Sequence, residues 1–341
     1  MCPRGPGSAR VRDSILRSMG EQLSDIGEFG LIRRLLGRVP VEGAGVVTGP
    51  GDDAAVVEVG DRMLIATADL LVEGRHFDRR FSTAADIGFK ALTVNMSDIA
   101  AMGGRPRWAL ISIGAPADEP VATLEDLYDG IAEAARASGV VVIGGDTVGA
   151  DAIIVSVAVL GEPGEGGVVG RSGARAGDLL GVTGGIGGAA AGLALLRAAE
   201  RDPEARALLE RFPNLADAHR RARARIREGM AATVAGAHAM IDVSDGLAQD
   251  VGHIAEASGT GVVLQTVDVP LEPGVAEASA WGASSALTGG DDYELAIAVA
   301  PEDLDRLRDA LAPTPFTIVG RFGADPGPDL PSGWDGFRGP A

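Results

Sequence analysis

The sequence contains few of the residues on which disulfide-bonded, zinc-binding and membrane-spanning proteins depend. It has one cysteine, Cys2, among 341 residues, which excludes an internal disulfide and a cysteine-based metal site. No hydrophobic run approaches the roughly 20 residues needed to cross a bilayer. The first residues lack the apolar core of a signal peptide. We therefore expect a cytoplasmic protein that does not bind membranes, with a disordered arm over residues 1–24 in which Met19 is an alternative start.

Positive charge is also scarce. The chain has 48 acidic and 30 basic residues, a net charge of −18, and Lys90 is its only lysine. This balance argues against nucleic-acid binding through a basic surface. The phosphate-binding motif G-x-x-x-x-G-K-[ST] and the protein-kinase signatures are missing, which excludes a P-loop enzyme and a protein kinase. An acidic protein can still bind anions where metal ions lie between the two.

Hydrophobic residues, 46% of the chain, form strand-like runs that alternate with helix-like stretches. This alternation predicts an α/β (α+β) protein. The glycine-rich segment 161–178 predicts a boundary between domains at 25–163 and 164–341. The expected strands are 54–59, 63–68, 108–114, 139–144, 152–161, 179–183, 238–243, 261–267, 293–299 and 316–322. The expected helices are 84–102, 123–138, several within 203–235, 246–258 and 301–312.

Acidic residues recur where strand-like runs open into glycine-rich turns. They are Asp52, Asp53, Asp69, Asp146, Asp242, Asp245, Asp291 and Asp292, and Asp98 joins them from a helix-like stretch. Two carboxylates ~4 Å apart repel by ~4 kcal/mol at an effective dielectric constant of 20, so a converging cluster requires cations. Oxygen ligands without histidine or cysteine select Mg²⁺, Ca²⁺ or Mn²⁺. Because Mg²⁺ commonly joins carboxylates to substrate phosphates, the pattern indicates a nucleotide site.

Several segments in order resemble the thiamine-monophosphate kinase family. They are "GPGDDAAV", "TADLLVEGRHF", "KALTVNMSDIAAMGGRP", "IGGDT", "GRSGARAGD", "IDVSDGL", "GGDDYEL" and "GWDGF", and they span Glu28 to Phe337. The resemblance implies the two-domain fold of the aminoimidazole ribonucleotide synthetase superfamily, which uses ATP without a P-loop. It further implies a homodimer that pairs N-terminal sheets, and a C-terminal mixed α/β sandwich.

The activity implied by the resemblance is phosphorylation of thiamine monophosphate by ATP and several Mg²⁺ ions, the final step of thiamine diphosphate biosynthesis. Since the acceptor phosphate is already ionised, no residue is expected to act as a general base. The alternatives are another ATP-using member of the superfamily, such as aminoimidazole ribonucleotide synthetase, and a non-catalytic Ca²⁺-binding or acidic solubilising protein. The absence of an EF-hand loop argues against a Ca²⁺-binding protein.

The resemblance also assigns roles to individual positions. The implied metal ligands are Asp53, Thr67, Ala68, Asp69, Asp98, Asp146, Asp242 and Asp245. The implied nucleotide contacts are Gly145, Asp146, Arg171 and Ser244, and the implied substrate contacts are His76, Asp291 and Trp334. Relatives often have Ser or Thr at position 68, so Ala68 has only its backbone carbonyl to offer. Asp291 replaces a Glu and reaches one methylene less far.

Structural interpretations remain open at several of these positions. They are a packed histidine at His76, an anchor for the C-terminus at Trp334, a linker charge at Arg171, a turn at Asp52, and a row of charges along one helix face from Lys90 to Asp98. The glycines of "GGIGG" (184–188) fit either a tight turn between strand and helix or a phosphate contact.

Overall fold

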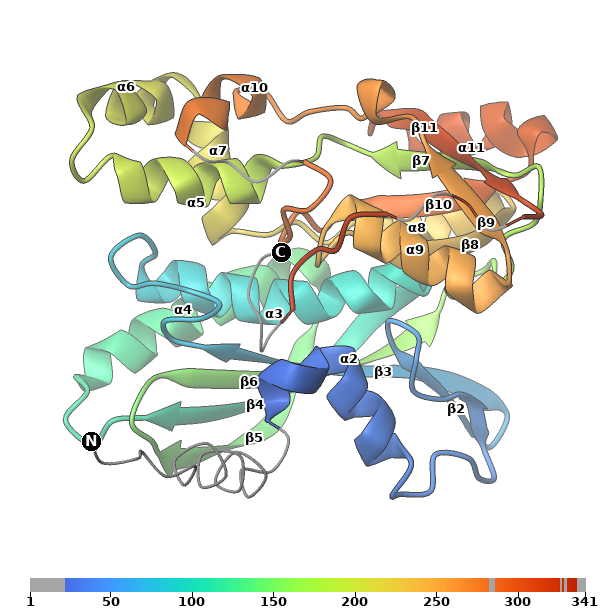
Figure 1. Cartoon of the computed structure of the whole chain (residues 1–341). Coiled ribbons are helices and arrows are strands. Elements are labelled where there is room, and N and C mark those ends of the chain that lie inside the picture. The colour runs from blue at the N-terminus through green and yellow to red at the C-terminus, as the bar shows by residue number, and fades with distance from the viewer. Residues whose placement is uncertain (1–21, 282–285, 326, 328–329, 336–341) are drawn as a thin grey trace, which may run out of the picture.

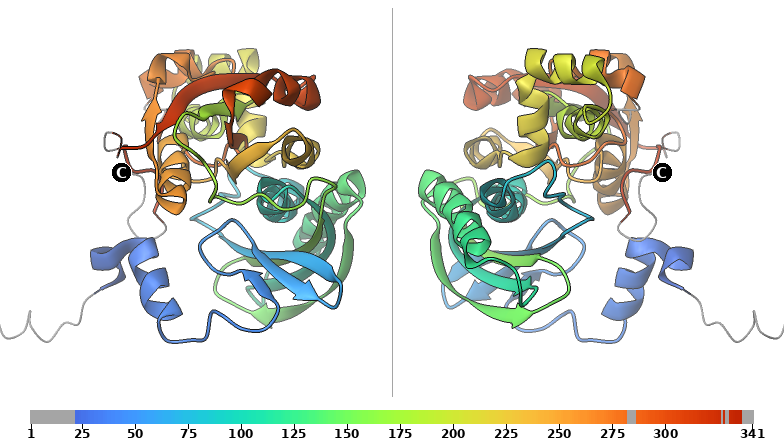
Figure 2. Two further views of the ribbon diagram at one scale, coloured as in Figure 1. Left: turned by 90° about the vertical axis from the view of Figure 1, so that its right-hand side faces the viewer. Right: turned by 90° about the vertical axis from the view of Figure 1, so that its left-hand side faces the viewer.

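The computed structural model describes residues 22–281, 286–325, 327 and 330–335, and it consists of two halves stacked on each other (Figure 1). Each half contains one β-sheet, and helix α3 (Ala84–Ala101) lies between the two sheets. Helix α2 (Leu23–Leu36) lies at one side of the molecule, apart from both sheets (Figure 2). Within the described residues, every helix is too short or too polar to cross a membrane.

The first half is built on a six-stranded sheet with the strand order β1-β2-β3-β6-β4-β5. Its strands are β1 (Val46–Thr48), β2 (Ala55–Val59), β3 (Arg62–Val72), β4 (Gly104–Ala115), β5 (Val141–Gly149) and β6 (Ile154–Pro163). Alternate residues of β6, namely Val155, Val157 and Val159, are buried and pack in one core with α3 and α4 (Val121–Ser138). Among the described residues, no helix of this half covers the opposite face of the sheet (Figure 1).

Helix α3 begins at a capping box, in which the Thr83 hydroxyl accepts from the Asp86 amide and the Asp86 carboxylate accepts from the Thr83 amide. It packs unusually close to α4. A Cβ atom on Gly88 would lie 1.9 Å from the backbone oxygen of Leu127, so only glycine fits there. This close contact fixes the position of α3, the helix that carries the predicted metal ligand Asp98.

The second half is built on a five-stranded antiparallel sheet with the order β8-β10-β7-β11-β9. Its strands are β7 (Leu179–Thr183), β8 (Ala237–Asp242), β9 (Gly261–Leu264), β10 (Leu295–Val299) and β11 (Phe316–Gly323). Its helices are α5 (Gly188–Ala198), α6 (Pro203–Arg211), α7 (Pro213–Arg220), α8 (Ile226–Val234), α9 (Leu247–Ser258), α10 (Val275–Ala278) and α11 (Leu304–Leu311). All residues of β10 are buried, and they alternate between two hydrophobic clusters of the second half.

The predicted fold class, a mixed α/β chain in two parts, is confirmed. Some predicted element bounds are wrong. The strand expected at 261–267 ends at Leu264, because a 3₁₀ turn follows at Thr266–Asp268. Helix α2 begins at Leu23, inside the predicted arm, whereas Cys2 and Met19 lie outside the described residues. The domain bounds 25–163 and 164–341 stay a prediction.

The strand expected at 139–144 is β5, which runs on to Gly149 and therefore contains Asp146. A Gly-Gly pair normally ends a strand-like run, which is why the sequence predicts a turn here. In the structure Gly145 continues the ladder, because β5 approaches β4 so closely that a Cβ atom would lie 1.7 Å from the backbone oxygen of Ile111. Asp146 is therefore a strand residue, not a turn residue.

Candidate active site

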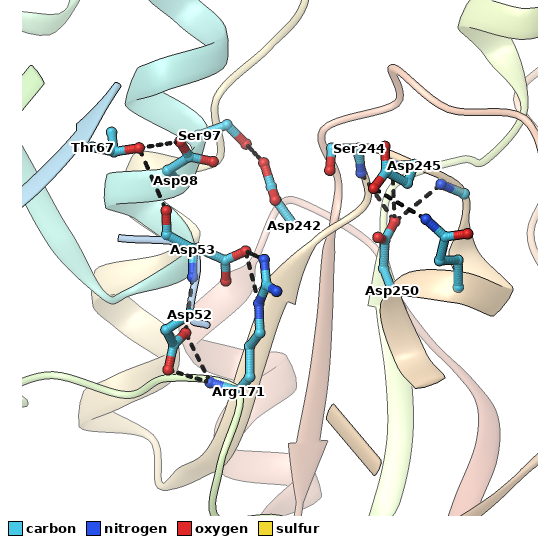
Figure 3. Close-up of polar contacts among 12 residues, drawn as sticks. Asp52, Asp53, Thr67, Ser97, Asp98, Arg171, Asp242, Ser244, Asp245 and Asp250 are labelled. Atoms are coloured by element: carbon cyan, nitrogen blue, oxygen red, sulfur yellow. Dashed lines mark hydrogen bonds and ion pairs between the residues drawn. The ribbon is translucent and has the colours of Figure 1, made fainter. Parts of the chain in front are cut away.

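Three carboxylates from both halves of the chain converge between the two sheets (Figure 3). Asp53 comes from the turn before β2, Asp98 from α3 and Asp242 from the end of β8. Each offers one oxygen, and these oxygens all lie within 4.8 Å of one another. The family resemblance implies that all three are metal ligands, and the fold brings them together.

Asp53 forms an ion pair with Arg171. Its side chain is 1% exposed, and its Oδ1 accepts from Arg171, with a distance of 2.6 Å to Nη2 and 3.2 Å to Nε. Its Oδ2 is buried and has no hydrogen-bond partner among the described residues. Burial raises the pKa of Asp53 to about 8, although the Arg171 guanidinium opposes that shift. Asp53 thus keeps one free buried oxygen next to two other carboxylates.

Hydroxyl groups hold the other two carboxylates. Thr67 on β3 donates to Oδ2 of Asp98 at 2.6 Å, and Ser97 on α3 donates to Oδ2 of Asp242 at 2.5 Å. Burial raises the pKa of Asp98 well above its ordinary value, and neighbouring carboxylates raise it further. Burial also raises the pKa of Asp242, to about 6, against the lowering effect of the Ser97 bond. Without cations these side chains therefore retain protons well above the pH at which an ordinary aspartate ionises.

Asp69 lies on the same face of β3 as Thr67, because side chains two residues apart on a strand point the same way. Its backbone amide donates to Oδ1 of Asn95 on α3 at 2.9 Å, which fixes β3 against the helix. Ala68 faces the opposite side of the sheet, where it pairs with Ala158 of β6. Only the backbone of Ala68 is therefore left for a metal contact, and that role stays a prediction.

Asp52 has a structural role. Its Oδ1 accepts from the Asp53 amide at 3.0 Å, and both of its oxygens accept from the Arg171 amide at 3.1 Å. The two adjacent acids, Asp52 and Asp53, therefore have different roles. Asp52 fixes the loop that carries Arg171, and Asp53 projects into the carboxylate cluster beside the Arg171 guanidinium (Figure 3). This arrangement also replaces the interpretation of Arg171 as a linker charge.

Asp245 lies in the turn between β8 and α9, beside Ser244. Oδ2 of Asp250, one turn into α9, accepts from the amides of Ser244, Asp245 and Gly246 at 3.1–3.2 Å. Burial raises the pKa of Asp245 to about 6, and the nearby carboxylate of Glu28 adds to this shift. The sequence reasoning missed Asp250, although an acid in the first turn of a helix is an ordinary partner for amides there.

Trp334 lies against this same turn. Its amide donates to the backbone oxygen of Asp245 at 2.9 Å, and its backbone oxygen accepts from Nε2 of Gln249 at 3.1 Å. Nearby, the Glu28 amide of α2 donates to the carboxylate of Asp335 at 3.1 Å. The backbone of the C-terminal segment is therefore anchored against this turn, and Trp334 is half-buried there.

Asp291 pairs with Lys90 across the two halves. The distance from Lys90 Nζ to Asp291 Oδ2 is 2.7 Å, and the Tyr293 hydroxyl donates to Asp291 Oδ1 at 2.9 Å. The interpretation of Lys90 as part of a charged row with Asp98 is therefore wrong. The cause is tertiary: α3 is buried on several sides, and Lys90 points toward the loop after residue 288. The remaining predicted substrate residue, His76, is exposed just after β3, and its Nδ1 accepts from the Val72 amide.

Gly145 and Asp146 do not join the cluster. Asp146 pairs with Ser112, Ser112 with Ser156, and Ser156 with Leu70 of β3. At about 4.8 Å between strands, Asp146 lies about 14 Å from Leu70. It also lies on the face of the sheet opposite α3, because Ser156 alternates with the buried Val155 and Val157. Asp146 therefore cannot reach the carboxylate cluster of its own chain.

The glycine-rich turn 184–188 is a packing turn. The Asp292 carboxylate accepts from the Gly187 amide at 2.7 Å and from the Ala189 amide at 3.3 Å, at the start of α5. A carboxylate of the chain itself thus occupies the helix N-terminus that a phosphate would need. Of the two interpretations left open by the sequence, the structure favours the tight turn.

The donor set fits Mg²⁺. It consists of hard oxygen atoms, and no histidine or cysteine belongs to the cluster of Asp53, Asp98 and Asp242. The unpartnered Oδ2 of Asp53 is the atom that a cation would satisfy. A single guanidinium, that of Arg171, cannot neutralise three carboxylates. The chemistry of the site is therefore that of an acidic pocket that binds cations together with an anion.

Comparison with known proteins agrees with this chemistry. Residues 51–162 match the family "AIR synthase related protein, N-terminal domain", and residues 175–331 match "AIR synthase related protein, C-terminal domain". The chain is 36% identical over 337 residues to a thiamine-monophosphate kinase of Mycobacterium tuberculosis, covering 96% of this chain and 95% of that protein.

Two solved structures have the same fold. One is the thiamine monophosphate kinase of Aquifex aeolicus, with a TM-score of 0.77, 32% identity, and coverage of 90% of this chain and 97% of that one. The other is AaThiL complexed with AMPPCP and TMP, with a TM-score of 0.78, 34% identity, and coverage of 91% and 95%. Both similarities extend over both halves of the chain, and thus over all elements that supply the carboxylate cluster.

Proposed function

This chain belongs to the thiamine-monophosphate kinase family, and on that basis we propose that it transfers the γ-phosphoryl group of ATP to thiamine monophosphate, giving thiamine diphosphate and ADP. The observation that carries the proposal is the cluster of Asp53, Asp98 and Asp242 between the two halves. Such a cluster suits a reaction that joins two polyanions. Thiamine monophosphate and the nucleotide together bring phosphate charge that acidic side chains alone would repel.

The chain needs to position groups rather than to move protons. The nucleophile is an oxygen of a phosphate that is largely ionised near neutral pH, so no general base is required. Asp53, Asp98 and Asp242 would hold Mg²⁺, with Asp69 and Asp245 as further ligands. When bound, Mg²⁺ supplies positive charge that screens the reacting phosphates and stabilises the transferring group. Thr67 and Ser97 orient their carboxylates through the hydrogen bonds described above.

Different parts of the chain would bind the nucleotide and the acceptor. Ser244 and Arg171 border the carboxylates on the side of the second half. The Arg171 guanidinium uses Nε and Nη2 for Asp53, and its remaining N–H groups are available for a phosphate. His76, Asp291 and Trp334 would hold thiamine monophosphate, whose cationic thiazolium ring suits an aromatic side chain. We further propose that the reaction takes place in the cytoplasm.

We also propose a homodimer in which the first-half sheets of two copies pair. Strand β5 lies at the edge of its sheet, all of its residues are exposed, and Val141, Ile143 and Val148 are among them. An apolar edge strand of this length is ordinarily covered by another element. Pairing would also explain Asp146, because a residue that cannot reach its own cluster could complete the site of the other copy.

Mixing two inactive variants tests this arrangement. If Asp146 acts across the dimer, a mixed dimer of Asp98→Asn and Asp146→Asn has one site with both native residues. Random exchange of subunits should then restore about a quarter of the wild-type turnover. If Asp146 acts within its own chain, every site in the mixture carries a substitution and no activity returns. Light scattering of the wild-type protein gives the mass of the particle independently.

The central experiment is an assay of ADP formation with purified protein, ATP and Mg²⁺. Thiamine monophosphate should support turnover, and thiamine should not, because thiamine lacks the phosphate that acts as nucleophile. Asp98→Asn is the control for contaminating kinases. Formation of thiamine monophosphate from thiamine, or ADP formation with neither compound, would replace the proposal with another ATP-dependent reaction of the superfamily.

A further inference from the structure

Lys90 is a buried cation with one acidic partner. Its side chain is 4% exposed, and its ammonium group donates to Asp291 at 2.7 Å and to the backbone oxygen of His219 on α7 at 3.4 Å. Among the ion pairs of the described residues, Lys90 takes part only in that with Asp291. Since a buried charge without a partner is strongly unfavourable, each member of this pair constrains the other.

The loop that carries Asp291 has an unusual backbone. Asp291 and Tyr293 have φ angles of 71° and 53°, which residues other than glycine rarely adopt. The Asp291 amide donates to the backbone oxygen of Ser244 at 2.8 Å, and the Tyr293 amide donates to that of Val243 at 2.8 Å. The loop therefore rests on the turn that carries Ser244 and Asp245. The bonds from Lys90 and Tyr293 to the Asp291 side chain hold the loop in this position as well.

The two side chains of the pair differ in their exposure to solvent. The Asp291 side chain is 36% exposed, whereas that of Lys90 is almost fully buried behind it. Lys90 also lies eight residues before Asp98 on α3, which is about 12 Å along the helix axis. A ligand in the site can therefore touch Asp291, but Lys90 acts on that ligand only through Asp291.

We infer that Lys90 is a positioning residue that fixes Asp291 and its loop in the conformation that binds the thiamine end of the acceptor. This inference rests on the proposed function. It assigns the only lysine of the chain to substrate specificity rather than to phosphate binding. Both Asp291 oxygens then face fixed donors, and the remaining lone pairs point in a defined direction toward the acceptor.

Steady-state kinetics of Lys90→Met tests the inference. Methionine fills a similar volume without the charge, so Asp291 loses its cation. The KM for thiamine monophosphate should rise about tenfold or more, and the KM for ATP should change less than about twofold. Thr93→Val is the matched control on the same helix, because within the described part of the chain the Thr93 hydroxyl bonds only to the Phe89 backbone oxygen of its own helix. It should change neither KM.

Two further variants separate positioning from stability. Lys90→Met combined with Asp291→Asn removes both charges, so the melting temperature should recover relative to Lys90→Met while the KM for thiamine monophosphate stays high. If Lys90→Met does not fold, Tyr293→Phe removes only the hydroxyl bond to Asp291 and should raise the same KM about threefold.

A lowered melting temperature with both KM values unchanged in Lys90→Met, or in Tyr293→Phe where that variant replaces it, would overturn the inference and leave Lys90 a purely structural residue. That outcome would leave the proposed function intact. In contrast, wild-type protein that fails to phosphorylate thiamine monophosphate would overturn the proposed function itself.

Discussion

The Ser97 hydroxyl donates a hydrogen bond of 2.5 Å to the Asp242 carboxylate, and this bond joins the first half of the chain to the second. Ser97 precedes Asp98 on α3, whereas Asp242 ends β8. Two neighbouring residues of one helix thus serve the same site in different ways. Asp98 contributes a carboxylate to the cluster, and Ser97 orients the carboxylate that comes from the other half.

We expect Ser97→Ala to lower kcat about tenfold or more without unfolding the protein. A hydrogen bond to a charged group contributes about 1.5–3 kcal/mol, and its loss would let the Asp242 carboxylate rotate away from the cluster. Steady-state kinetics measures this effect. Ser138→Ala is the control, because the Ser138 hydroxyl bonds to the Ala134 backbone oxygen at the end of α4. Equal activity of both variants would mean that Ser97 has no role in the reaction.

Asp98→Asn should abolish turnover while leaving the metal-free protein as stable as the wild type or more so. The substitution removes one of three mutually repelling carboxylates and so relieves the empty site, but it also removes a ligand of the metal. Melting curves with and without Mg²⁺, together with kcat, check both parts. A variant that keeps more than about a tenth of the wild-type kcat, a loss below ~1.4 kcal/mol, would contradict the assignment of Asp98 as a metal ligand.

The metal-free protein should lose stability as the pH rises toward about 8. Burial raises the pKa of Asp53 to about 8, so the folded chain holds a proton that the unfolded chain has already released. Between the ordinary aspartate range and about pH 8 the folded chain thus binds one proton more than the unfolded chain, so its stability falls with rising pH until that proton leaves. The groups that face Asp53 are Asp52, Arg171, Asp98 and Asp242. The pKa of His219, lowered to about 4 by burial, affects stability only below the ordinary histidine range.

Melting curves in a chelator and in Mg²⁺, between about pH 7 and pH 9, measure this dependence. Mg²⁺ should raise the melting temperature more at the higher pH, because it no longer competes with the proton. Asp53→Asn should flatten the pH dependence of the metal-free protein. If the stability of the metal-free wild-type protein does not fall between about pH 7 and pH 8, Asp53 is already ionised in the folded state.

Trp334→Ala should raise the KM for thiamine monophosphate roughly 3- to 30-fold, because contact of an aromatic ring with a cationic ring contributes ~0.5–2 kcal/mol. The backbone bonds of Trp334 to Asp245 and Gln249 survive the substitution, so the tail should stay in place. The KM for ATP should hardly change, and Trp334→Phe should retain most of the affinity. An equal rise in the KM for both substrates would indicate that Trp334 anchors the C-terminal segment and does not contact the acceptor.

The sequence was sufficient to predict the parts of the site that depend on local pattern. Acids at strand ends, joined by Asp98 on a helix, predicted that several carboxylates converge, because short turns between strands and helices place such residues at one edge. The family resemblance implied which of these acids bind metal. The strands β7 and β11 follow from hydrophobic runs with clear ends. The division between Asp52 and Asp53 did not follow, since it depends on the loop that returns more than a hundred residues later with Arg171.

Other contacts were beyond the reach of sequence reasoning for the same reason. Lys90 and Asp291 are 201 residues apart, and helical spacing could offer only Asp98 as a partner. Strand β5 continues past Gly145 because β4 lies so close to it, and no sequence pattern within β5 shows this close contact. Asp250 is a different case, because its position in the first turn of α9 is a local signal for hydrogen bonds to the amides there.

The burial of α3 between the two sheets has a consequence for dissecting this protein. Tyr293 and Ala222 of the second half belong to the same hydrophobic core as Ile131 of α4, and Ala101 of α3 packs with the core around β10. A fragment cut near Pro163 would thus expose apolar surface on both products. We expect neither piece to fold alone, and denaturant should unfold the whole chain in one cooperative transition.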